Sequence, residues 1–504
     1  MKLCPFGEAA LFLDLEIERD PDRAARTLAA ARHLASRLPS IDVAVGAGVL
    51  VLAGVGAWDE LAGFCAEAAR AAAAPLSATP AAEDAPLVID ACYDGPDLAA
   101  VAAALSVSTS EVTALHAGAD YRVELLGFLP GFAYLGPVPP ALALPRRPSP
   151  RPSVPAGSIG VAGGFTGVYP SASPGGWHLL GRAVGFRPFD PARRPPLALR
   201  PGQRVRFAPT DHAPAPPSPP SPPSPSAPPI TRGRYLEVLV AASVSSIQDG
   251  GRAGMLSAGL PPSGPLDRQA FTAANLAVGN DAGAAAIEVA LGRLELRAHG
   301  ALMVSIDGEP AVALAEGDRV VIAPSARAVR YLAARGGVDV PLVLGSRSTL
   351  LAARLGGLEG RPLRKGDAVP VGDQASGRVG GAAPAVVDPP ELARLLVEPG
   401  PHLDRFPDGA FEQLLAGEFR VSRHGDRVGV RLDGARITTG SSALLLPVPM
   451  VRGAIEIATD GTPIVLGPDH PTTGGYPVLG ALARASQALL GRLRPGHRVR
   501  LELA

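Results

Sequence analysis

A loop near the end of the chain contains the strongest candidates for catalytic residues. Asp469 is followed by the hydroxyl groups of Thr472 and Thr473, and then by Gly474 and Gly475. Glycine leaves backbone N–H groups open to a ligand, and a carboxylate beside such donors can act as a general acid or base, or hold Mg²⁺. Asp469 is therefore the first catalytic candidate.

Other carboxylates stand in glycine- and proline-rich segments of the second half. The remaining candidates for acid–base chemistry or for Mg²⁺ are Asp249, Glu288 and Asp267. An Asp that precedes Gly or Arg commonly fixes a turn through its own side chain, so loop capping is the alternative for this set.

Arginine is the cation available for binding a substrate or a phosphate, because the lysines are Lys2 and Lys365 alone. Its planar guanidinium matches a carboxylate or phosphate with two parallel hydrogen bonds, although any one arginine is more often part of a structural ion pair. The candidates are Arg122, Arg151, Arg252, Arg347 and Arg427. Four aromatic residues could either form a wall of the binding site beside these arginines or belong to the core: Tyr134, Tyr169, Trp177 and Tyr476.

The sequence lacks the motifs that are typical of several reaction classes. Neither lysine follows a GxxxxG segment, so a P-loop is absent, and neither sits in the Met-Lys-Met-like turn that carries biotin. HExxH, paired-cysteine and GxSxG motifs are also missing, which argues against a self-contained zinc or serine hydrolase and predicts no metal site. If ATP binds, with Mg²⁺, its phosphates need arginines, glycine-loop amides or a partner chain.

The composition indicates which classes of partner and which cellular compartment to expect. The 504 residues carry 47 basic and 47 acidic side chains, a balance that gives no reason to expect nucleic acid or an anionic membrane. Three scattered cysteines favour a reducing, cytoplasmic location. The first residues lack the order of a signal peptide, and the apolar run 43–58 is short and interrupted by glycine, as expected of two buried strands.

The first 80 residues predict an α+β domain. Residues 10–16 alternate as in a strand, and Asp20-Pro21 is a favourable helix start. Residues 41–45 and 49–53 predict a strand pair, and a second helix with Trp58 and Leu61 on one face follows. No chemical cluster is evident here, so the domain is expected to be mainly structural.

Residues 85–211 predict a β-rich barrel with two short helices, at 97–105 and at 111–116. Ser108 and Glu111 form a capping box for the second helix, and His116 at its end is expected to be structural. In residues 127–134, Pro130-Gly131 predicts a type II turn that projects Phe128, Phe132 and Tyr134, or else a hydrophobic plug at a barrel end. The glycines of 157–167 could approach an anion or simply form turns.

Residues 212–230 are dominated by Pro and Ser and predict an extended spacer. A second unit, 231–504, begins with a strand at 236–240. A helix around residues 273–276 ends near Gly279, and a strand begins at residue 287. The halves are expected to pack together, with the spacer raising their local concentration; larger homo-oligomers are compatible with this arrangement.

Two sets of segments resemble a known family. In the first half these are 121–123, 127–134, 151–158 and 173–177, which resemble allophanate hydrolase subunit 1, a family that includes the B-type subunit of 5-oxoprolinase, sporulation kinase inhibitors and part of urea carboxylase. In the second half, segments 246–252, 261–268, 335–341 and 344–349 resemble allophanate hydrolase subunit 2, which includes the C-type subunit of 5-oxoprolinase. The resemblance implies a mainly β protein with cyclophilin-like barrels in both halves.

The last third departs from the family pattern at polar and aromatic positions. Arg452-Gly453-Ala454-Ile455-Glu456 stands where Pro-Gly-Ala-Ile-Gln is usual, and His470-Pro471 where Arg/Lys-Gln is usual. Val430 stands where Tyr is usual. These departures leave the substrate open.

The resemblance implies three possible functions. The favoured one is a fused pair of B-type and C-type parts of an ATP-dependent 5-oxoprolinase, which opens a cyclic amide to glutamate together with a separate A-type (LamB/YcsF) protein. The second is the carboxyltransferase half of a urea or amide carboxylase, with biotin on another chain. The third is a regulator that binds a histidine kinase.

Overall fold

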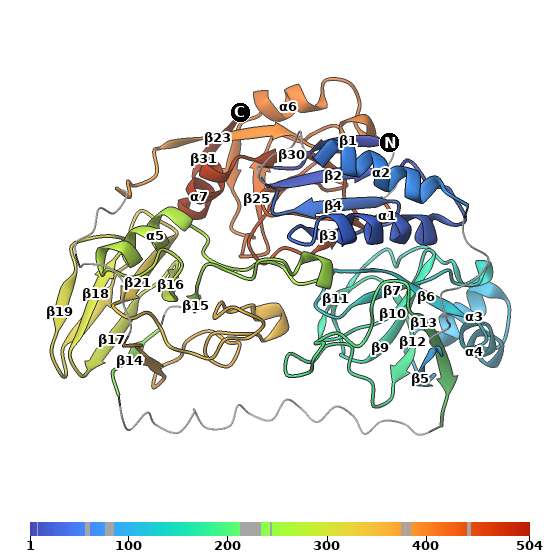
Figure 1. Cartoon of the computed structure of the whole chain (residues 1–504), viewed down its shortest axis with the longest axis horizontal. Helices are drawn as coiled ribbons and strands as arrows, with labels where there is room; N and C mark the ends of the chain where they lie inside the picture. Colours follow the sequence, from blue (N-terminus) through green and yellow to red (C-terminus); the bar gives the residue numbers. More distant parts are fainter. Residues whose placement is uncertain are drawn as a thin grey trace.

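The computed structural model describes residues 1–7, 9–55, 61–75, 85–211, 233–241, 244–373, 379, 385–440 and 445–504. The predicted spacer 212–230 and Trp58 lie outside these residues. Figure 1 shows four parts: an N-terminal sheet and a C-terminal barrel at the top, a first barrel at the lower right and a β-sandwich at the lower left.

The N-terminal part is an antiparallel sheet covered by two helices. Strands β1 (Lys2–Pro5), β2 (Ala10–Asp14), β3 (Asp42–Val45) and β4 (Val49–Ala53) pair in the order β1-β2-β4-β3, with helices α1 (Arg23–Arg37) and α2 (Leu61–Ala73). The sequence missed β1, and α1 begins after the expected Asp20-Pro21 start because the Asp20 carboxylate accepts the N–H of Asp22 in a preceding turn.

Alternating side chains give this sheet two buried faces. Leu11 and Leu13 point toward α1 and α2, whereas Ala10 and Phe12 point the other way, as the period of a strand requires. On that second face the sheet packs against the C-terminal barrel, in a cluster that includes Val448, Met450, Ala454, Leu466, Val478 and Ala481. The sheet is therefore the main apolar contact between the two halves.

The first barrel is closed by seven strands. They are β5 (Leu87–Cys92), β6 (Tyr121–Leu126), β7 (Ala133–Gly136), β9 (Ser158–Ala162), β10 (Phe165–Val168), β12 (His178–Ala183) and β13 (Arg204–Pro209), and β8 (Arg151–Val154) pairs with β11 (Ser173–Gly175) beside them. Helices α3 (Leu98–Leu105) and α4 (Thr109–Ala117) follow β5, and the predicted capping box of α4 is confirmed.

Two features of this barrel, the environment of His116 and the turn at Pro130-Gly131, bear on predictions made from the sequence. His116 is fully buried, with Nδ1 2.7 Å from the Tyr93 hydroxyl and Nε2 2.8 Å from Thr166 Oγ1, and burial lowers its pKa to about 3. The predicted type II turn is present: Phe132 N–H donates to Leu129 O at 2.9 Å, and Gly131 has φ +87°.

The aromatic side chains around that turn point inward, contrary to the expectation that it projects them. Phe132 packs edge-to-face on Tyr134, Tyr169 and Trp177 at centroid distances of 5.1–5.3 Å, and all four are at most 6% exposed. Burial of large aromatic surface stabilises a core. Tyr134, Tyr169 and Trp177 are therefore core residues and do not form the wall of a ligand site.

The second half begins with a sandwich of two sheets. One contains β14 (Tyr235–Val240), β17 (Leu294–His299), β20 (Arg319–Ile322) and β22 (Ala368–Pro370); the other contains β15 (Val244–Gln248), β16 (Ala286–Ala290), β18 (Leu302–Ile306), β19 (Val312–Leu314) and β21 (Val329–Ala334). Helix α5 (Arg268–Ala277) covers Tyr331, as the contact between Phe271 and Tyr331 shows. The segment between β15 and α5 crosses the centre of the molecule below the N-terminal sheet (Figure 1).

A second closed barrel ends the chain. Its strands are β23 (Leu392–Pro399), β24 (Phe419–Val421), β25 (Gly429–Gly434), β27 (Ala454–Ile457), β28 (Pro463–Leu466), β30 (Val478–Leu482) and β31 (Arg498–Leu503), with β26 (Val448–Pro449) paired to β29 (Thr473–Gly474). Helix α6 (Ala410–Ala416) follows β23, and α7 (Arg484–Arg492) precedes β31. The expected fold class, mainly β with an α+β N-terminal sheet and a barrel in each half, is confirmed.

The two barrels repeat one topology. Taken in chain order as a to g, the strands of each follow the circular order a-f-d-e-c-b-g, and in each the first and last strands pair in parallel. The last strands begin within matching segments, Arg-Pro-Gly-Gln-Arg-Val-Arg at 200–206 and Arg-Pro-Gly-His-Arg-Val-Arg at 494–500. Asp97 and His402 are also equivalent, since their side chains accept the N–H groups of Leu179 and Val478.

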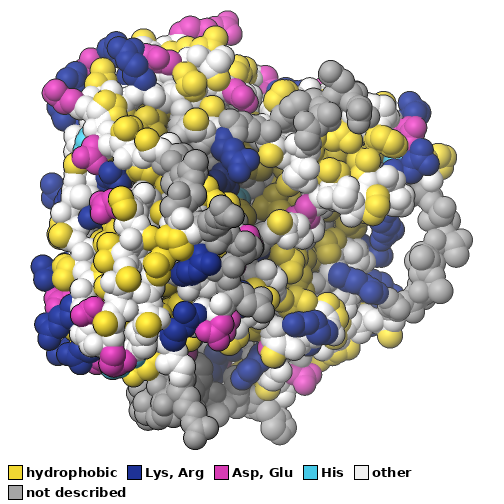
Figure 2. All heavy atoms as spheres, turned by 60° about the vertical axis from the view of Figure 1, so that its left-hand side comes forward, with side chains coloured by type: hydrophobic (Ala, Val, Ile, Leu, Met, Phe, Trp, Pro, Cys, Tyr) yellow, Lys and Arg dark blue, Asp and Glu magenta, His cyan; other side chains and the backbone are white. Residues whose placement is uncertain are grey.

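Among the described residues no single helix has the length and apolar composition to cross a membrane; one pair, α3 and α4, meets the test together but is bent by 95°. On the face drawn in Figure 2, basic and acidic side chains are scattered among each other, as the balanced charge of the sequence suggests.

Cutting the chain between residues 212 and 230 is expected to leave the halves associated. The apolar contact around Phe12, which is 1% exposed, is supported by ion pairs from Lys2 to Asp404 at 2.9 Å and from Arg405 to Glu18 at 2.6 Å. A protease site inserted in the spacer, followed by cleavage and gel filtration, measures this. Phe12→Asp is the control that should separate the halves, and separation of the cleaved chain without that change would contradict the prediction.

Candidate functional site

A cavity of about 380 Å³ lies between the N-terminal sheet and the second half. Its walls come from the turn between β1 and β2, from the start of β3, from the segment after β15, from the loops before β27 and β29, and from the first turn of α7. Pockets that hold small molecules begin at about this size. Residues 1–80 were expected to be mainly structural, and two of them, Phe6 and Asp42, belong to this wall.

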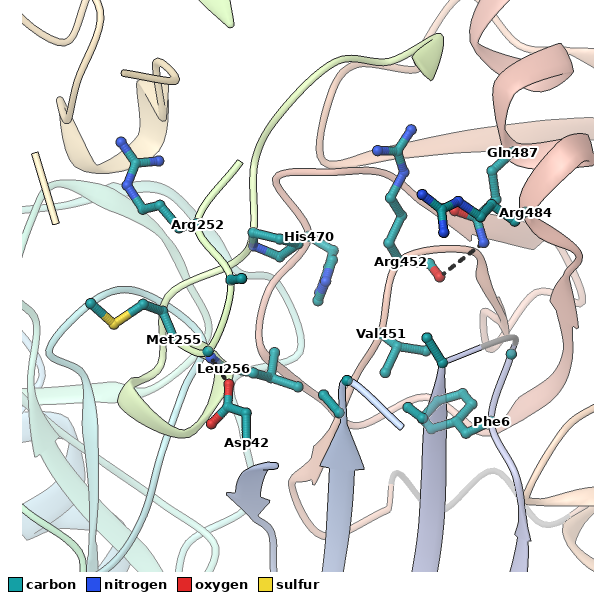
Figure 3. A pocket seen from close by; sticks show the side chains of 18 of the residues that line it. Phe6, Asp42, Arg252, Met255, Leu256, Val451, Arg452, His470, Arg484 and Gln487 are labelled. Carbon is teal, nitrogen blue, oxygen red and sulfur yellow. Dashed lines mark hydrogen bonds between the residues drawn. The ribbon is translucent and has the colours of Figure 1, made fainter. Parts of the chain in front are cut away.

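One side of the pocket is cationic. Figure 3 shows Arg452, Arg484 and Gln487 gathered on this side, and Arg268 also lines the pocket. Arg452 donates from Nη2 to Leu266 O at 2.8 Å, while its buried Nη1 has no partner among the described residues. Burial, followed by repulsion from Arg268 and Arg427, lowers the pKa of Arg452 to about 9. Leaving a buried guanidinium N–H unpaired costs stability.

His470 presents an acceptor to the same pocket. Its Nδ1 lies 2.9 Å from Pro471 O, and because a carbonyl can only accept, Nδ1 carries the proton. Burial lowers the pKa of His470 to about 4, so the ring is neutral at pH 7 and Nε2 is an acceptor. The pocket thus combines N–H donors with one basic nitrogen.

Asp42 connects the two halves at the edge of the pocket. Its carboxylate accepts the N–H groups of Leu256 at 2.6 Å and of Ser257 at 3.1 Å, so the start of β3 holds the segment after β15 in place (Figure 3). Phe6, Leu256 and Val451 form an apolar floor in the same view.

A buried ion network lies behind this pocket and unites three predicted site residues. Arg427 donates from Nε to Asp469 Oδ2 at 2.7 Å, from Nη1 to Glu288 Oε1 at 2.6 Å and from Nη2 to Gly264 O at 2.7 Å. Glu288 Oε2 also accepts from Tyr331 Oη at 2.6 Å and from Leu266 N at 2.9 Å. Burial alone would lower the pKa of Arg427, but Asp469 and Glu288 raise it above its usual value.

These contacts give Asp469 and Glu288 a structural role, because each carboxylate oxygen already accepts a hydrogen bond. Their catalytic role remains a prediction. Asp267 caps α5 through Gln269 N and Ala270 N and pairs with Arg492, which matches the capping alternative. The described residues contain no group of three or more His, Cys, Asp or Glu arranged to hold a metal ion.

Asp249 organises a separate loop. Its carboxylate accepts from Ser346 Oγ and Ser348 Oγ, both at 2.6 Å, and from the backbone N–H groups of Gly251 and Arg347. Arg347 itself donates to Asp339 and to Val340 O. The contacts of Asp249 therefore match the turn-fixing alternative.

The other predicted arginines do not converge on one point. Arg122 is exposed and donates to Gly202 O, and Arg151 forms a two-pronged pair with Asp97 in the first barrel. Arg252 lines the pocket, but its guanidinium turns away to Val343 O and Ser348 O (Figure 3). Of the five arginine candidates, Arg427 alone joins the ion network with Asp469 and Glu288.

The predicted residues 472–476 meet the first barrel. Tyr134 Oη lies 3.4 Å from Thr473 Oγ1, and a Cβ added to Gly127 would lie 2.2 Å from the Thr473 side chain. Thr472 Oγ1 is buried without a partner among the described atoms, while Gly474, Gly475 and Tyr476 are half-buried. The loops singled out in the two halves are thus in contact.

Glu456 lies behind this junction. It is 7% exposed, and its carboxyl group has no hydrogen-bond or ion-pair partner in the part of the chain that the structure describes. A Cβ added to Gly474 would lie 2.3 Å from Glu456 Oε1. Burial raises its pKa to about 8, so this carboxyl group is mostly protonated at pH 7.

Comparison with known proteins identifies the family. The family model described as carboxyltransferase domain, subdomain C and D, matches residues 1–199, and that for subdomain A and B matches residues 258–503. The second half is 33% identical over 277 residues to the C-type subunit of the 5-oxoprolinase of Escherichia coli K12, and it covers 89% of that protein. The chain belongs to the carboxyltransferase-domain family.

Other relatives place this carboxyltransferase-domain protein as a fusion. Its first half is 55% identical over 115 residues to the B-type subunit of the 5-oxoprolinase of Escherichia coli O157:H7, a match that spans about half of that protein (52%). The crystal structure of TTHA0988 covers 98% of this chain, at 34% identity and a TM-score of 0.82. A match to the urea amidolyase of Lachancea kluyveri has 31% identity over 304 residues but covers 16% of that protein.

Pocket residues that the site prediction missed are Asp42, Arg268, Arg452, His470, Arg484 and Gln487. A signal was present for two of them, because Arg452 and His470 are positions where the chain departs from the family pattern, and both line the same pocket. Asp42 and Arg484 lie in ordinary strand and helix starts and carried no such signal.

Proposed function

We propose that this chain supplies the B-like and C-like parts of an ATP-dependent 5-oxoprolinase, acting with a separate A-type (LamB/YcsF) protein. The observation that carries the proposal is that regions homologous to both of these parts share one chain and together wall one pocket. The substrate would be a small cyclic amide with a carboxylate, 5-oxo-L-proline, and the product L-glutamate.

The proposed reaction requires few chemical groups beyond those that this chain supplies. An amide is unreactive, and ATP, when bound to the complex, supplies the phosphoryl group that turns the amide oxygen into a leaving group. The arginines of the pocket fit a carboxylate or a phosphoryl group equally well. This chain's residues would bind the acid, exclude water through Phe6, Leu256 and Val451, and position the ring.

The test combines the purified chain with a purified A-type protein, 5-oxo-L-proline, ATP and Mg²⁺. Glutamate and ADP should appear in equal amounts, and neither should appear when the chain or the A-type protein is left out. Absence of glutamate with every A-type partner tried would overturn the proposal.

The match to urea amidolyase supports a second candidate, the carboxyltransferase half of a biotin-dependent carboxylase of urea or a similar amide. Addition of a biotin carboxylase that carries its own biotinyl domain separates the two candidates. Bicarbonate- and urea-dependent ATP hydrolysis that requires this chain would favour the second.

A further inference from the structure

The N-terminal sheet leaves the edge of one strand open. Strand β3 is the last in the order β1-β2-β4-β3, on the side of the sheet that faces the first barrel (Figure 1). In the turn between β3 and β4, Gly46 donates its N–H to Val49 O at 2.9 Å, and hydrogen-bonded pairs alternate along antiparallel strands. The backbone N–H and C=O groups of Val43 and Val45 therefore point away from β4.

A crevice of about 440 Å³ lies along this open edge. Among the described residues, neither Val43 nor Val45 has a backbone partner on the side away from β4. Unpaired N–H and C=O groups at a sheet edge are a template for pairing with another chain. The rest of the lining comes from α1, from the first barrel and from the segment after β15: Leu28, Ala31 and Ala35, then Pro201, then Gly254 and Ser257.

The crevice is basic on the side of the first barrel. Arg32 lines it, and Arg122 donates from Nη1 to Gly202 O at 2.8 Å. A Cβ added to Gly202 would lie 3.1 Å from Arg32 Nη2, so both guanidinium groups reach the same glycine. Both arginines are exposed, and neither pairs with a carboxylate of the described ranges. Asp42, the acidic residue of the lining, already accepts two backbone N–H groups, so the crevice favours a negatively charged ligand.

We propose that this crevice binds an extended, acidic peptide segment of a partner protein, which adds a strand to the edge of β3. Alternate backbone groups of the peptide pair with Val43 and Val45, and a carboxylate of the peptide lies between Arg32 and Arg122. In strand addition the backbone supplies affinity, and alternate side chains supply specificity. This inference goes beyond the proposed function, because it assigns an interaction surface and does not depend on the reaction.

Fluorescence polarisation with the full chain tests the charge contact. The probe is a labelled peptide, Ser-Val-Thr-Glu-Thr-Val-Ser with blocked ends, whose palindromic sequence suits either strand direction. Arg32→Met, or Gln in place of the Glu of the peptide, is expected to weaken binding about two- to fivefold, as is usual for an exposed ion pair. The loss in Arg32→Met should shrink when the peptide contains Gln. Arg37→Met is the matched control, because Arg37 ends the same helix and lies 3.9 Å from Glu67; it should leave binding unchanged.

N-methyl groups on the peptide test the backbone pairing without changing the protein. Methylation of the two Val nitrogens and methylation of the two Thr nitrogens block opposite edges of the added strand. One of these peptides is expected to bind at least tenfold more weakly, and the other within about threefold of the parent peptide. Equal losses would overturn strand addition, whether or not any protein variant folds.

Val45→Pro makes the same test from the side of the protein. It removes an N–H that points into the crevice, and Pro is tolerated on an edge strand when the missing N–H faces away from the sheet. Binding of the peptide should fall about tenfold, while circular dichroism stays unchanged. Unchanged binding in a folded Val45→Pro variant would contradict the pairing.

Three further outcomes would overturn the proposal. The first is a peptide that does not bind at millimolar concentration, and the second is inorganic phosphate that displaces the peptide more strongly than sodium chloride of equal ionic strength, which would indicate a site for small anions. The third is a dimer of the chain on gel filtration that the peptide dissociates, which would assign the edge of β3 to a second copy. None of these outcomes bears on the glutamate assay.

Discussion

Replacing Arg427 with methionine is expected to lower the free energy of unfolding of the second half by about 3–5 kcal/mol, the usual effect of removing one partner from a buried ion pair. Arg427 is 7% exposed and holds Asp469 and Glu288, which come from two different parts of that half. Without it, two buried carboxylates lose their counter-charge. Urea denaturation followed by circular dichroism measures the change.

Two further variants make this result specific. Arg436→Met removes an exposed arginine whose pair is solvated on both sides, so it should cost less than about 1 kcal/mol. Adding Glu288→Gln and Asp469→Asn to Arg427→Met should recover part of the loss, because the stranded charges are then neutral. A loss in Arg427→Met no greater than that in Arg436→Met would show that the network does not join the sandwich to the C-terminal barrel.

Replacing Glu456 with glutamine is expected to stabilise the protein increasingly as the pH rises. The pKa of this carboxyl group is about 8 in the folded chain against 4.5 as its ordinary value, so the folded state retains a proton that the unfolded chain releases. The stability associated with the protonated group is complete below about pH 4.5 and is lost as the pH rises to about 8. At about 1.4 kcal/mol per pKa unit, the full loss is on the order of 5 kcal/mol.

Thermal unfolding of wild type and Glu456→Gln at pH 5 and pH 8 tests this expectation. Glutamine nearly preserves the shape of the side chain and cannot ionise, so the difference in melting temperature should be much larger at pH 8. Glu418→Gln is the control, since the Glu418 side chain is 70% exposed. An equal difference at both pH values would mean that Glu456 ionises normally in the fold.

Local patterns in the sequence were reliable guides to elements and poor guides to contacts. The strand at 87–92, the capping box of Ser108 and the type II turn at Pro130-Gly131 follow from residues close together in the chain, and all three are present. Strand β1 was missed because Pro5 and Gly7 obscure its four-residue alternation.

Site residues were harder to predict because pairing partners lie far apart in the sequence. Arg427, Asp469 and Glu288 were each expected to be functional, but their mutual pairing joins positions 139 residues apart. From the sequence alone, Tyr134 and Trp177 fit a core as well as they fit the wall of a ligand site. Their burial in the structure assigns them to the core. The repeated Arg-Pro-Gly-x-Arg-Val-Arg segment is a sequence signal of two equivalent barrels that the sequence predictions did not use.

Parallel pairing of the first and last strands has a consequence for how such proteins can be assembled. In each barrel the chain enters and leaves side by side, with Leu87 next to Val205 and Leu392 next to Arg498. Adjacent ends make a unit easy to splice into another chain or to cut out as a cassette. The same barrels can therefore be carried on separate polypeptides, as in the two bacterial relatives, or strung on one, without any strand having to change its neighbours.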